Sequence, residues 1–235
     1  MIKVGCCGFP MGRGEYFSQF KVVEVQNTFY KPPQVKTAEK WRDQAPPDFE
    51  FSLKAWQLIT HEPTSPTYRK AKIEIPEREK KYYGSFKPTD RVFEAWEETK
   101  KIVHALKAKI VIFQCPASFV PSDEHKGNLK RFFQSLERED LLFVWEPRGK
   151  WDDEEIKELC AELNLIHGVD PFSRPSVSGR INYFRLHGKE GYRYKYTDED
   201  LRSLLNMCRV KSQSYSMFNN VFMAEDAVRF REILK

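Results

Sequence analysis

Eight short apolar runs, most of them separated by helical patterns, constrain the fold of this 235-residue chain more than any other feature. Each run has the length and the β-branched or aromatic content of a buried strand. The expected strands are Ile2–Cys7, Val22–Gln26, Phe49–Lys54, Ile110–Cys115, Leu141–Glu146, Leu165–Val169, Asn182–His187 and Tyr215–Asn219. Strands that alternate with helices predict a parallel sheet with right-handed crossovers.

Helix signals between these runs agree with that pattern. Pro88-Thr89-Asp90 opens one amphipathic segment, Asp152 is suited to be the N-cap of another, and a last helix is expected from about Met223 to Leu234. About eight such units in roughly 200–250 residues predict an α/β fold, a single-domain TIM-like (β/α)₈ barrel over residues 1–235. A doubly wound open sheet is the alternative, but the chain has neither a G-x-G-x-x-G nor a G-K-[ST] motif.

Composition narrows the class of protein further. Hydrophobic residues make up 40% of the chain, which suits a globular core, and the net charge of +5 is compatible with anionic substrates or nucleic acid without implying either. No apolar run reaches the roughly 20 residues that cross a bilayer, and no leader pattern follows Met1, so we expect a cytoplasmic protein. Abundant Lys and Glu with few Asn and Gln make the composition thermophile-like.

The segment 62–88 does not fit the barrel pattern. It carries four prolines and the aromatic residues Tyr82, Tyr83 and Phe86. Its basic residues include Arg69, Lys70, Lys72, Arg78, Lys80 and Lys81. It is longer than the usual connection of about 4–6 residues and would follow the third strand over the functional face. Two interpretations stay open: a surface excursion, or a basic, aromatic lid over an anionic ligand.

Polar side chains gather at the ends of the expected strands. Successive side chains of a strand point to opposite faces, so an apolar set that packs under helices leaves the polar set pointing into the barrel. Most of the polar set falls at C-terminal strand ends, where barrel enzymes place their sites. The predicted cluster consists of Glu24, Lys54, Gln114, Glu146, Arg148, Arg185, His187, Asn219 and Asn220.

Side-chain chemistry suggests a role for each member of this cluster. Lys54 and Arg185 would hold an anionic group, Arg185 in bidentate fashion. His187 is the natural proton carrier near neutral pH, and Glu24 or Glu146 would serve as a base or orient the imidazole. The side-chain amides of Gln114, Asn219 and Asn220 would supply neutral hydrogen bonds. The competing interpretation is an ion-paired plug that closes the barrel mouth.

A metal site is a weaker hypothesis. His61, Glu146, Asp170 and His187 are competent ligands for zinc or manganese and could converge. The chain has only five histidines and no H-x-x-E-H spacing, so we assign no metal ligands. A divalent metal is thus not favoured, and with no nucleotide motif present the cofactor is unknown.

Several segments, taken in order, resemble one protein family over nearly the whole chain. They are Gly5–Phe9, Glu24–Tyr30, Phe49–Ala55 with Thr60 and His61, Phe113–Pro116 with Phe119, Glu146–Arg148, Phe184–Gly188 and Phe218–Asn220. Together they resemble the DUF72 (YecE-like) family, and this resemblance implies a TIM-barrel fold with no established activity.

The resemblance also bears on the site. The family's polar positions match the predicted cluster and add His61, and we include Tyr30 among the ligand-binding candidates. The chain departs from the family pattern at Cys6-Cys7, where Thr-Ser is usual, and at Gln26, where Asn is usual. The stretch 146–151 is one residue shorter than usual. These departures bear on the geometry around the first and fifth strands.

Three hypotheses for function follow. The first is an enzyme-like barrel that binds a small anionic or phosphorylated ligand and performs acid/base chemistry of a hydrolase or lyase type. The second is a nucleic-acid-binding barrel, with an endonuclease-like fold as its only analogy. The third is a non-catalytic sensor or partner protein. The sequence does not indicate the oligomeric state.

Overall fold

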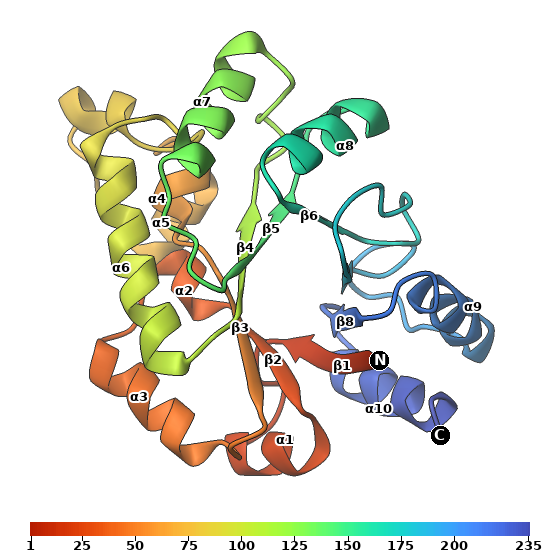
Figure 1. Cartoon of the computed structure of the whole chain (residues 1–235). Helices are drawn as coiled ribbons and strands as arrows, with labels where there is room; N and C mark the ends of the chain where they lie inside the picture. The colour runs from red at the N-terminus through yellow and green to blue at the C-terminus, as the bar shows by residue number, and fades with distance from the viewer.

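The computed structural model describes residues 1–235 and shows a closed barrel of eight parallel strands that pair in chain order (Figure 1). The strands are β1 Ile2–Cys7, β2 Val22–Val25, β3 Glu50–Lys54, β4 Ile110–Gln114, β5 Leu142–Glu146, β6 Ile166–Val169, β7 Asn182–Leu186 and β8 Ser214–Phe218. The predicted TIM-like barrel is confirmed, and every observed strand end lies within one residue of its expected position.

Helices surround the barrel (Figure 1). They are α1 Arg13–Gln19, α2 Asn27–Tyr30, α3 Val35–Gln44, α4 Gln57–Thr60, α5 Pro66–Ala71, the 3₁₀ helix η1 Glu77–Tyr82, α6 Asp90–Leu106, α7 Asp123–Gln134, α8 Asp153–Glu162, α9 Asp198–Cys208 and α10 Met223–Ile233. α6 begins at Asp90, as expected, and the Thr89 hydroxyl accepts the Val92 N–H and caps it. The connection from β6 to β7 contains no helix, and no helix is long and apolar enough to cross a membrane.

Each strand alternates between two apolar environments. One face packs under the helices in an aromatic-rich core that includes Phe51, Phe113 and Trp145. The other face fills the barrel interior with Cys7, Val22, Ile110, Ile112, Val144, Ile166, Ile181, Tyr183, Tyr215 and Met217. Because side chains repeat with period two, the polar residues that lie two positions further along these strands also point inward. The predicted alternation is therefore confirmed.

Gly168 in β6 keeps the interior open beside the polar strand ends. A Cβ atom built there would lie 2.5 Å from Cγ1 of Val144 and 3.5 Å from Cβ of Glu146. Both residues belong to β5, the neighbouring strand. Glycine at this position lets the β5 side chains keep their rotamers, and any larger residue would push Val144 into the core.

The segment 62–88 is anchored to the barrel rather than lying loosely over it. The Phe86 ring is fully buried among core aromatic rings, and Tyr68 and Tyr83 are also buried. Most of the basic side chains of the segment are exposed, including Arg69 and Lys70 on α5. The segment thus combines an apolar inner side with a basic outer side.

A left-handed turn joins this segment to α4. Residues 84–86 have φ angles of 77°, 51° and 52°, a backbone conformation that only glycine adopts without cost. Their N–H groups donate to the carbonyls of residues 58–60, the end of α4. These carbonyls have no partner within a helix of four residues, so the turn satisfies them. The strained turn fixes the end of α4, where His61 follows.

We expect Phe86→Ala to lower the free energy of unfolding by about 3–5 kcal/mol, because it removes a fully buried ring and leaves a cavity. Chemical denaturation of the purified variant measures this loss. Tyr82→Ala is the matched control, because Tyr82 lies in the same segment with its side chain exposed, and it should cost much less. Equal, small losses in both variants would show that residues 62–88 are not anchored as described.

Candidate functional site

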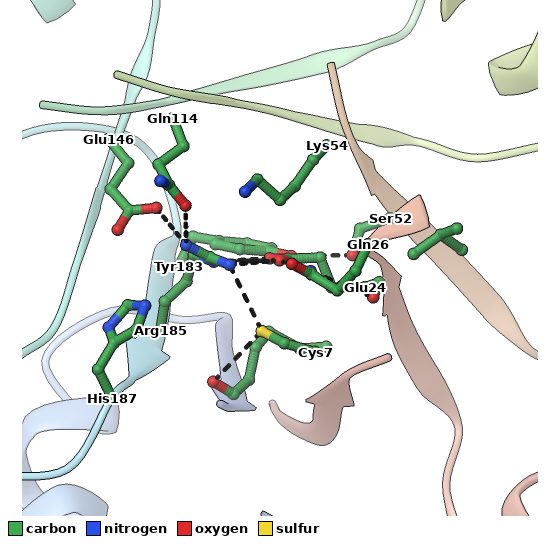
Figure 2. Close-up of polar contacts among 12 residues, drawn as sticks. Cys7, Glu24, Gln26, Ser52, Lys54, Gln114, Glu146, Tyr183, Arg185 and His187 are labelled. Carbon is green, nitrogen blue, oxygen red and sulfur yellow. Dashed lines mark hydrogen bonds and ion pairs between the residues drawn. The ribbon is translucent and has the colours of Figure 1, made fainter. Parts of the chain in front are cut away.

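Polar side chains from five strands converge inside the C-terminal mouth of the barrel (Figure 2). They come from the ends of β2, β3, β4, β5 and β7, and all are buried or half-buried. These residues are Glu24, Lys54, Gln114, Glu146 and Arg185. The placement follows from the period of two along each strand and from the shared direction of parallel strands.

Arg185 lies at the centre and is fully buried. Its Nε and Nη2 donate to the Glu24 carboxylate at 2.8–3.1 Å. Its Nη1 donates to Oε1 of Gln114 at 2.9 Å and to Oε2 of Glu146 at 2.5 Å. The last N–H points at the Cys7 sulfur, 3.8 Å from Nη2. All five donors of the guanidinium therefore have partners within the protein.

Glu24 is also fully committed. Besides Arg185, its carboxylate accepts the Tyr183 hydroxyl at 2.9 Å and the Gln26 amide. The Tyr183 hydroxyl shares a hydrogen bond of 2.8 Å with the Ser52 hydroxyl. Burial alone would raise the pKa of Glu24, but the charge and hydrogen bonds of Arg185 outweigh it and lower that pKa. Glu24 stays ionised and holds Arg185 in place.

These contacts correct two predicted roles. Arg185 does not offer a bidentate fork to an external anion, because Glu24 already occupies it. Glu24 is not a free base, because both of its oxygens accept hydrogen bonds and its side chain has no exposed surface. The floor of the mouth is an ion-paired layer made of Arg185, Glu24 and Glu146. The plug interpretation therefore describes these three residues and does not extend to the rest of the cluster.

Lys54 lies beside this floor without joining it. Its side chain is only 5% exposed, yet no carboxylate lies within 4.0 Å of Nζ and no hydrogen bond reaches it. Figure 2 shows the amine pointing toward the side of Gln114 with no contact drawn to its neighbours. Nζ lies 3.8 Å from the centre of the Phe29 ring. Burial, and then the charge of Arg185, lowers the pKa of Lys54 to about 7.

His61 is held firmly next to the same aromatic ring. Its Nδ1 lies 2.8 Å from the Thr60 hydroxyl, its carbonyl accepts the Tyr68 hydroxyl at 2.9 Å, and its ring meets Phe29 edge to face at 4.9 Å. Burial, followed by the charge of Lys54, lowers the pKa of His61 to about 3. The imidazole is therefore neutral at physiological pH, with Nε2 free of protein partners.

Arg148 and His187 form the more exposed rim of the site. Arg148 donates through Nε and Nη2 to Oε1 of Glu146, and Nη2 lies 2.7 Å from Nε2 of His187. A guanidinium can only donate hydrogen bonds, so Nε2 of His187 accepts this hydrogen bond and the ring N–H is on Nδ1. That Nδ1 lies 3.7 Å from Oδ2 of Asp170, which also accepts the His187 backbone N–H at 2.8 Å.

Glu146 connects the floor and the rim. One oxygen bonds Arg185 and the other bonds Arg148. Burial acts to raise the pKa of Glu146, but the charges of Arg185 and Arg148 lower it to about 2. The carboxylate stays ionised, so it positions Arg148 and is a poor proton donor or acceptor near neutral pH.

Three predicted ligand-binding residues make no hydrogen bond to these side chains. Asn220 is fully buried and donates to the Tyr194 carbonyl and to Asp226, while its Oδ1 is buried without a partner. Asn219 is half-buried after β8 and makes no side-chain hydrogen bond. Tyr30 accepts a hydrogen bond from Lys70 of α5 at 3.1 Å, one ring away from Lys54 through Phe29.

Sequence reasoning missed Tyr183 and Phe29 as parts of the site. Tyr183 shares its strand face with Arg185, so the alternation in β7 was an available signal. Phe29 lies on α2 directly after β2, where no period of two applies. The four metal candidates of the sequence do not converge, because no three His, Cys, Asp or Glu side chains lie together as a ligand set.

Comparison with known proteins agrees with this architecture. The family model described as "Protein of unknown function DUF72" matches residues 13–235. The chain belongs to the DUF72 family. The resemblance to this family seen in the sequence is thereby confirmed.

Individual relatives match most or all of this DUF72 chain. The UPF0759 protein YunF of Bacillus subtilis (strain 168) is 28% identical over 244 residues, which cover 87% of this chain and 79% of YunF. A crystal structure of a DUF72 family protein from Enterococcus faecalis V583 matches with a TM-score of 0.74 at 21% identity, covering 100% and 97% of the two chains. A xylose isomerase domain-containing protein from Salmonella typhimurium LT2 matches at a TM-score of 0.58 and 13% identity, covering 96% and 91%. The structural matches show a shared barrel fold.

Proposed function

We propose that this DUF72 protein binds a small anionic or phosphorylated ligand at the C-terminal mouth of the barrel and transfers a proton on it, in a hydrolase- or lyase-type reaction. Lys54 carries the proposal. A lysine that served only stability would pair with Glu24 or Glu146, yet Lys54, only 5% exposed, has no carboxylate within 4.0 Å of Nζ and no hydrogen bond to it. An anionic oxygen of a ligand would supply the missing hydrogen-bond acceptor for Nζ of Lys54.

Arg148 supplies the second cation of the proposed site. Its side chain is 38% exposed, and Nη2 bridges Glu146 and His187, so a ligand at the mouth can reach it from solvent. A guanidinium favours planar, two-oxygen contact with carboxylate or phosphate groups. We infer that Arg148 turns from His187 to the ligand when the ligand binds.

That movement would free the proton acceptor. With Arg148 withdrawn, the Nε2 lone pair of His187 faces the mouth, and the imidazolium that forms on taking a proton has Asp170 beside Nδ1. Asp170 also fixes the His187 backbone, so the ring is oriented from two sides. His187 acts as the base, Asp170 as its positioning residue, and Glu146 as the group that holds Arg148.

Calorimetric titration with sulfate tests the anion site. We expect Lys54→Met and Arg148→Met each to weaken sulfate binding by about 10- to 100-fold, because a hydrogen bond to a charged group contributes about 1.5–3 kcal/mol. Lys70→Met is the matched control, since Lys70 is exposed on α5 and its amine bonds Tyr30 and none of the proposed anion-binding residues. Unchanged affinity in both site variants would refute the anion site.

The nucleic-acid hypothesis predicts a different pattern in the same experiment. The exposed Arg69, Lys70 and Lys72 of the 62–88 segment would carry phosphate contacts, so Lys70→Met would weaken binding of an oligonucleotide. The logarithm of that affinity would also fall linearly with the logarithm of salt concentration. A flat salt response, with sulfate affinity sensitive to Lys54 and Arg148 but not to Lys70, supports the small-ligand site.

A further inference from the structure

Lys54 has the surroundings of a nucleophilic amine as well as those of an anion-binding cation. A lysine next to carboxylates is normally protonated and hydrogen-bonded, and its nitrogen then has no lone pair to offer. Here Arg185 binds both Glu24 and Glu146, the two carboxylates that Lys54 would otherwise use. The guanidinium also places a like charge near Nζ. Lys54 therefore lacks the carboxylate partners that would stabilise its ammonium form, because both carboxylates of the floor pair with Arg185.

A second lysine of the barrel interior shows the contrast. Lys3 of β1 also points inward, at the opposite end of the barrel, where its Nζ bonds the Glu50 carboxylate and lies 5.4 Å from the centre of the Tyr215 ring. Lys3 therefore has both an aromatic neighbour and a carboxylate partner, and it is a structural lysine. Lys54 has the aromatic neighbour, Phe29, without the partner.

We propose that Lys54 forms a Schiff base with a carbonyl compound that carries an anionic group. This inference rests on the proposed function for the anionic group, which Arg148 would bind, and it names the substrate class of that same site. Lys54 is 5% exposed at a strand end inside the mouth, and Nζ is not among the fully buried atoms without a partner, while the side chains of Arg148 and His187 at the rim are 38% and 24% exposed.

The step balances without an oxidant or reductant. The Nζ lone pair attacks the carbonyl carbon, the C=O π pair moves to oxygen, and oxygen takes a proton while nitrogen loses one. The hydroxyl of the resulting carbinolamine takes up a proton and leaves as water when the nitrogen lone pair forms the C=N bond, and the product is the protonated Schiff base. His187, released from Arg148, carries these protons in the proposed site, and the neutral His61 next to Phe29 has a free imidazole nitrogen.

The lowered pKa of Lys54, about 7, agrees with this geometry. At pH 7 about half of the Lys54 amine is neutral, whereas an exposed lysine with a pKa near 10.4 is neutral in less than about one molecule in a thousand. Lys54 thus holds on the order of 10³ times more reactive amine than a surface lysine. Its lower basicity reduces intrinsic nucleophilicity only in part.

Reductive trapping tests the inference on the wild-type protein. We expect glyoxylate with cyanoborohydride at pH 7 to modify Lys54 at least ten times faster than Lys3 or any exposed lysine, as mapped by peptide mass spectrometry. Lys54→Met should lose the rapid adduct and Lys3→Met should keep it. Mapping in the wild type does not depend on the folding of either variant. Modification spread over surface lysines, with Lys54 unmodified, would overturn the proposal.

A neutral aldehyde separates this inference from the proposed function. If both hold, glycolaldehyde reacts at Lys54 more slowly than glyoxylate, and sulfate slows the glyoxylate reaction. If glycolaldehyde and glyoxylate react equally at Lys54 and sulfate has no effect, the nucleophile is supported and the anion site is refuted. If sulfate binds through Lys54 but neither aldehyde modifies it, the anion site is supported and the Schiff base is refuted.

Discussion

Arg185→Met is expected to lower the free energy of unfolding by about 3–5 kcal/mol, because removing one partner of a buried ion pair leaves uncompensated charge. Two carboxylates, those of Glu24 and Glu146, would lose their central cation while remaining out of water. Denaturant unfolding at pH 7 measures the loss. Arg91→Met is the control, since Arg91 forms only partly exposed ion pairs and its replacement should change stability little.

A triple variant distinguishes charge from packing as the cause. Combining Arg185→Met with Glu24→Gln and Glu146→Gln removes both uncompensated carboxylates, and we expect much of the lost stability to return. If the triple variant is no more stable than Arg185→Met alone, loss of packing around the long side chain is the cause. Recovery would show that the floor is held by mutual charge compensation.

The same network sets the acid stability of the protein. The pKa of Glu146 is lowered in the folded protein from 4.5 to about 2. A lowered carboxylate pKa contributes stability that is present above the unfolded value and is lost as pH falls through the folded value. The Glu146 contribution should therefore disappear between about pH 4.5 and 2. In Arg185→Met this part of the acid transition should shrink, because the cation that lowers the pKa is gone.

Much of the fold and part of the site were predictable from local pattern alone. The period of two along each strand places Glu24, Lys54, Gln114, Glu146 and Arg185 on the inner face, and all five are found there. Alternation does not extend to Asn220. It lies two residues beyond the end of β8, and its amide donates to Asp226.

The pairing among these residues was not predictable. Arg185 of β7 binds Glu24 of β2, and these two strands are not neighbours in the barrel. Their distance depends on the diameter and stagger of the closed sheet, which no single segment encodes. The consequence is a change of role, since Arg185 neutralises the floor and Lys54 is left as the unpaired group.

The role of the 62–88 segment depended on one turn. Its proline and lysine content predicted a surface excursion or a lid, but Phe86 enters the core through the left-handed turn at 84–86. That turn bonds the end of α4, and Tyr68 of the same segment bonds the His61 carbonyl. Composition describes the exposed side of such a segment and is silent on its buried contacts. We infer that the segment positions His61.

Binding of sulfate at pH 8 is expected to take up close to one proton per protein. Lys54, with a pKa of about 7, is mostly neutral at that pH, and an anion placed against Nζ favours the charged form and raises that pKa. Sulfate has no proton to gain or lose in this range, so the proton enters the protein. Calorimetry in two amine buffers of different ionisation enthalpy measures the uptake.

The sign of the pH dependence follows from the same linkage. Sulfate binds the protonated form of Lys54, and above about pH 7 the fraction of that form falls about tenfold per pH unit. The sulfate affinity should fall by the same factor until the pH reaches the pKa of Lys54 in the sulfate complex. Below pH 7 this dependence should level off. His187→Gln should keep the uptake at pH 8 and Lys54→Met should abolish it. Uptake that survives in Lys54→Met would mean that another group binds the anion, and the central role of Lys54 would be refuted.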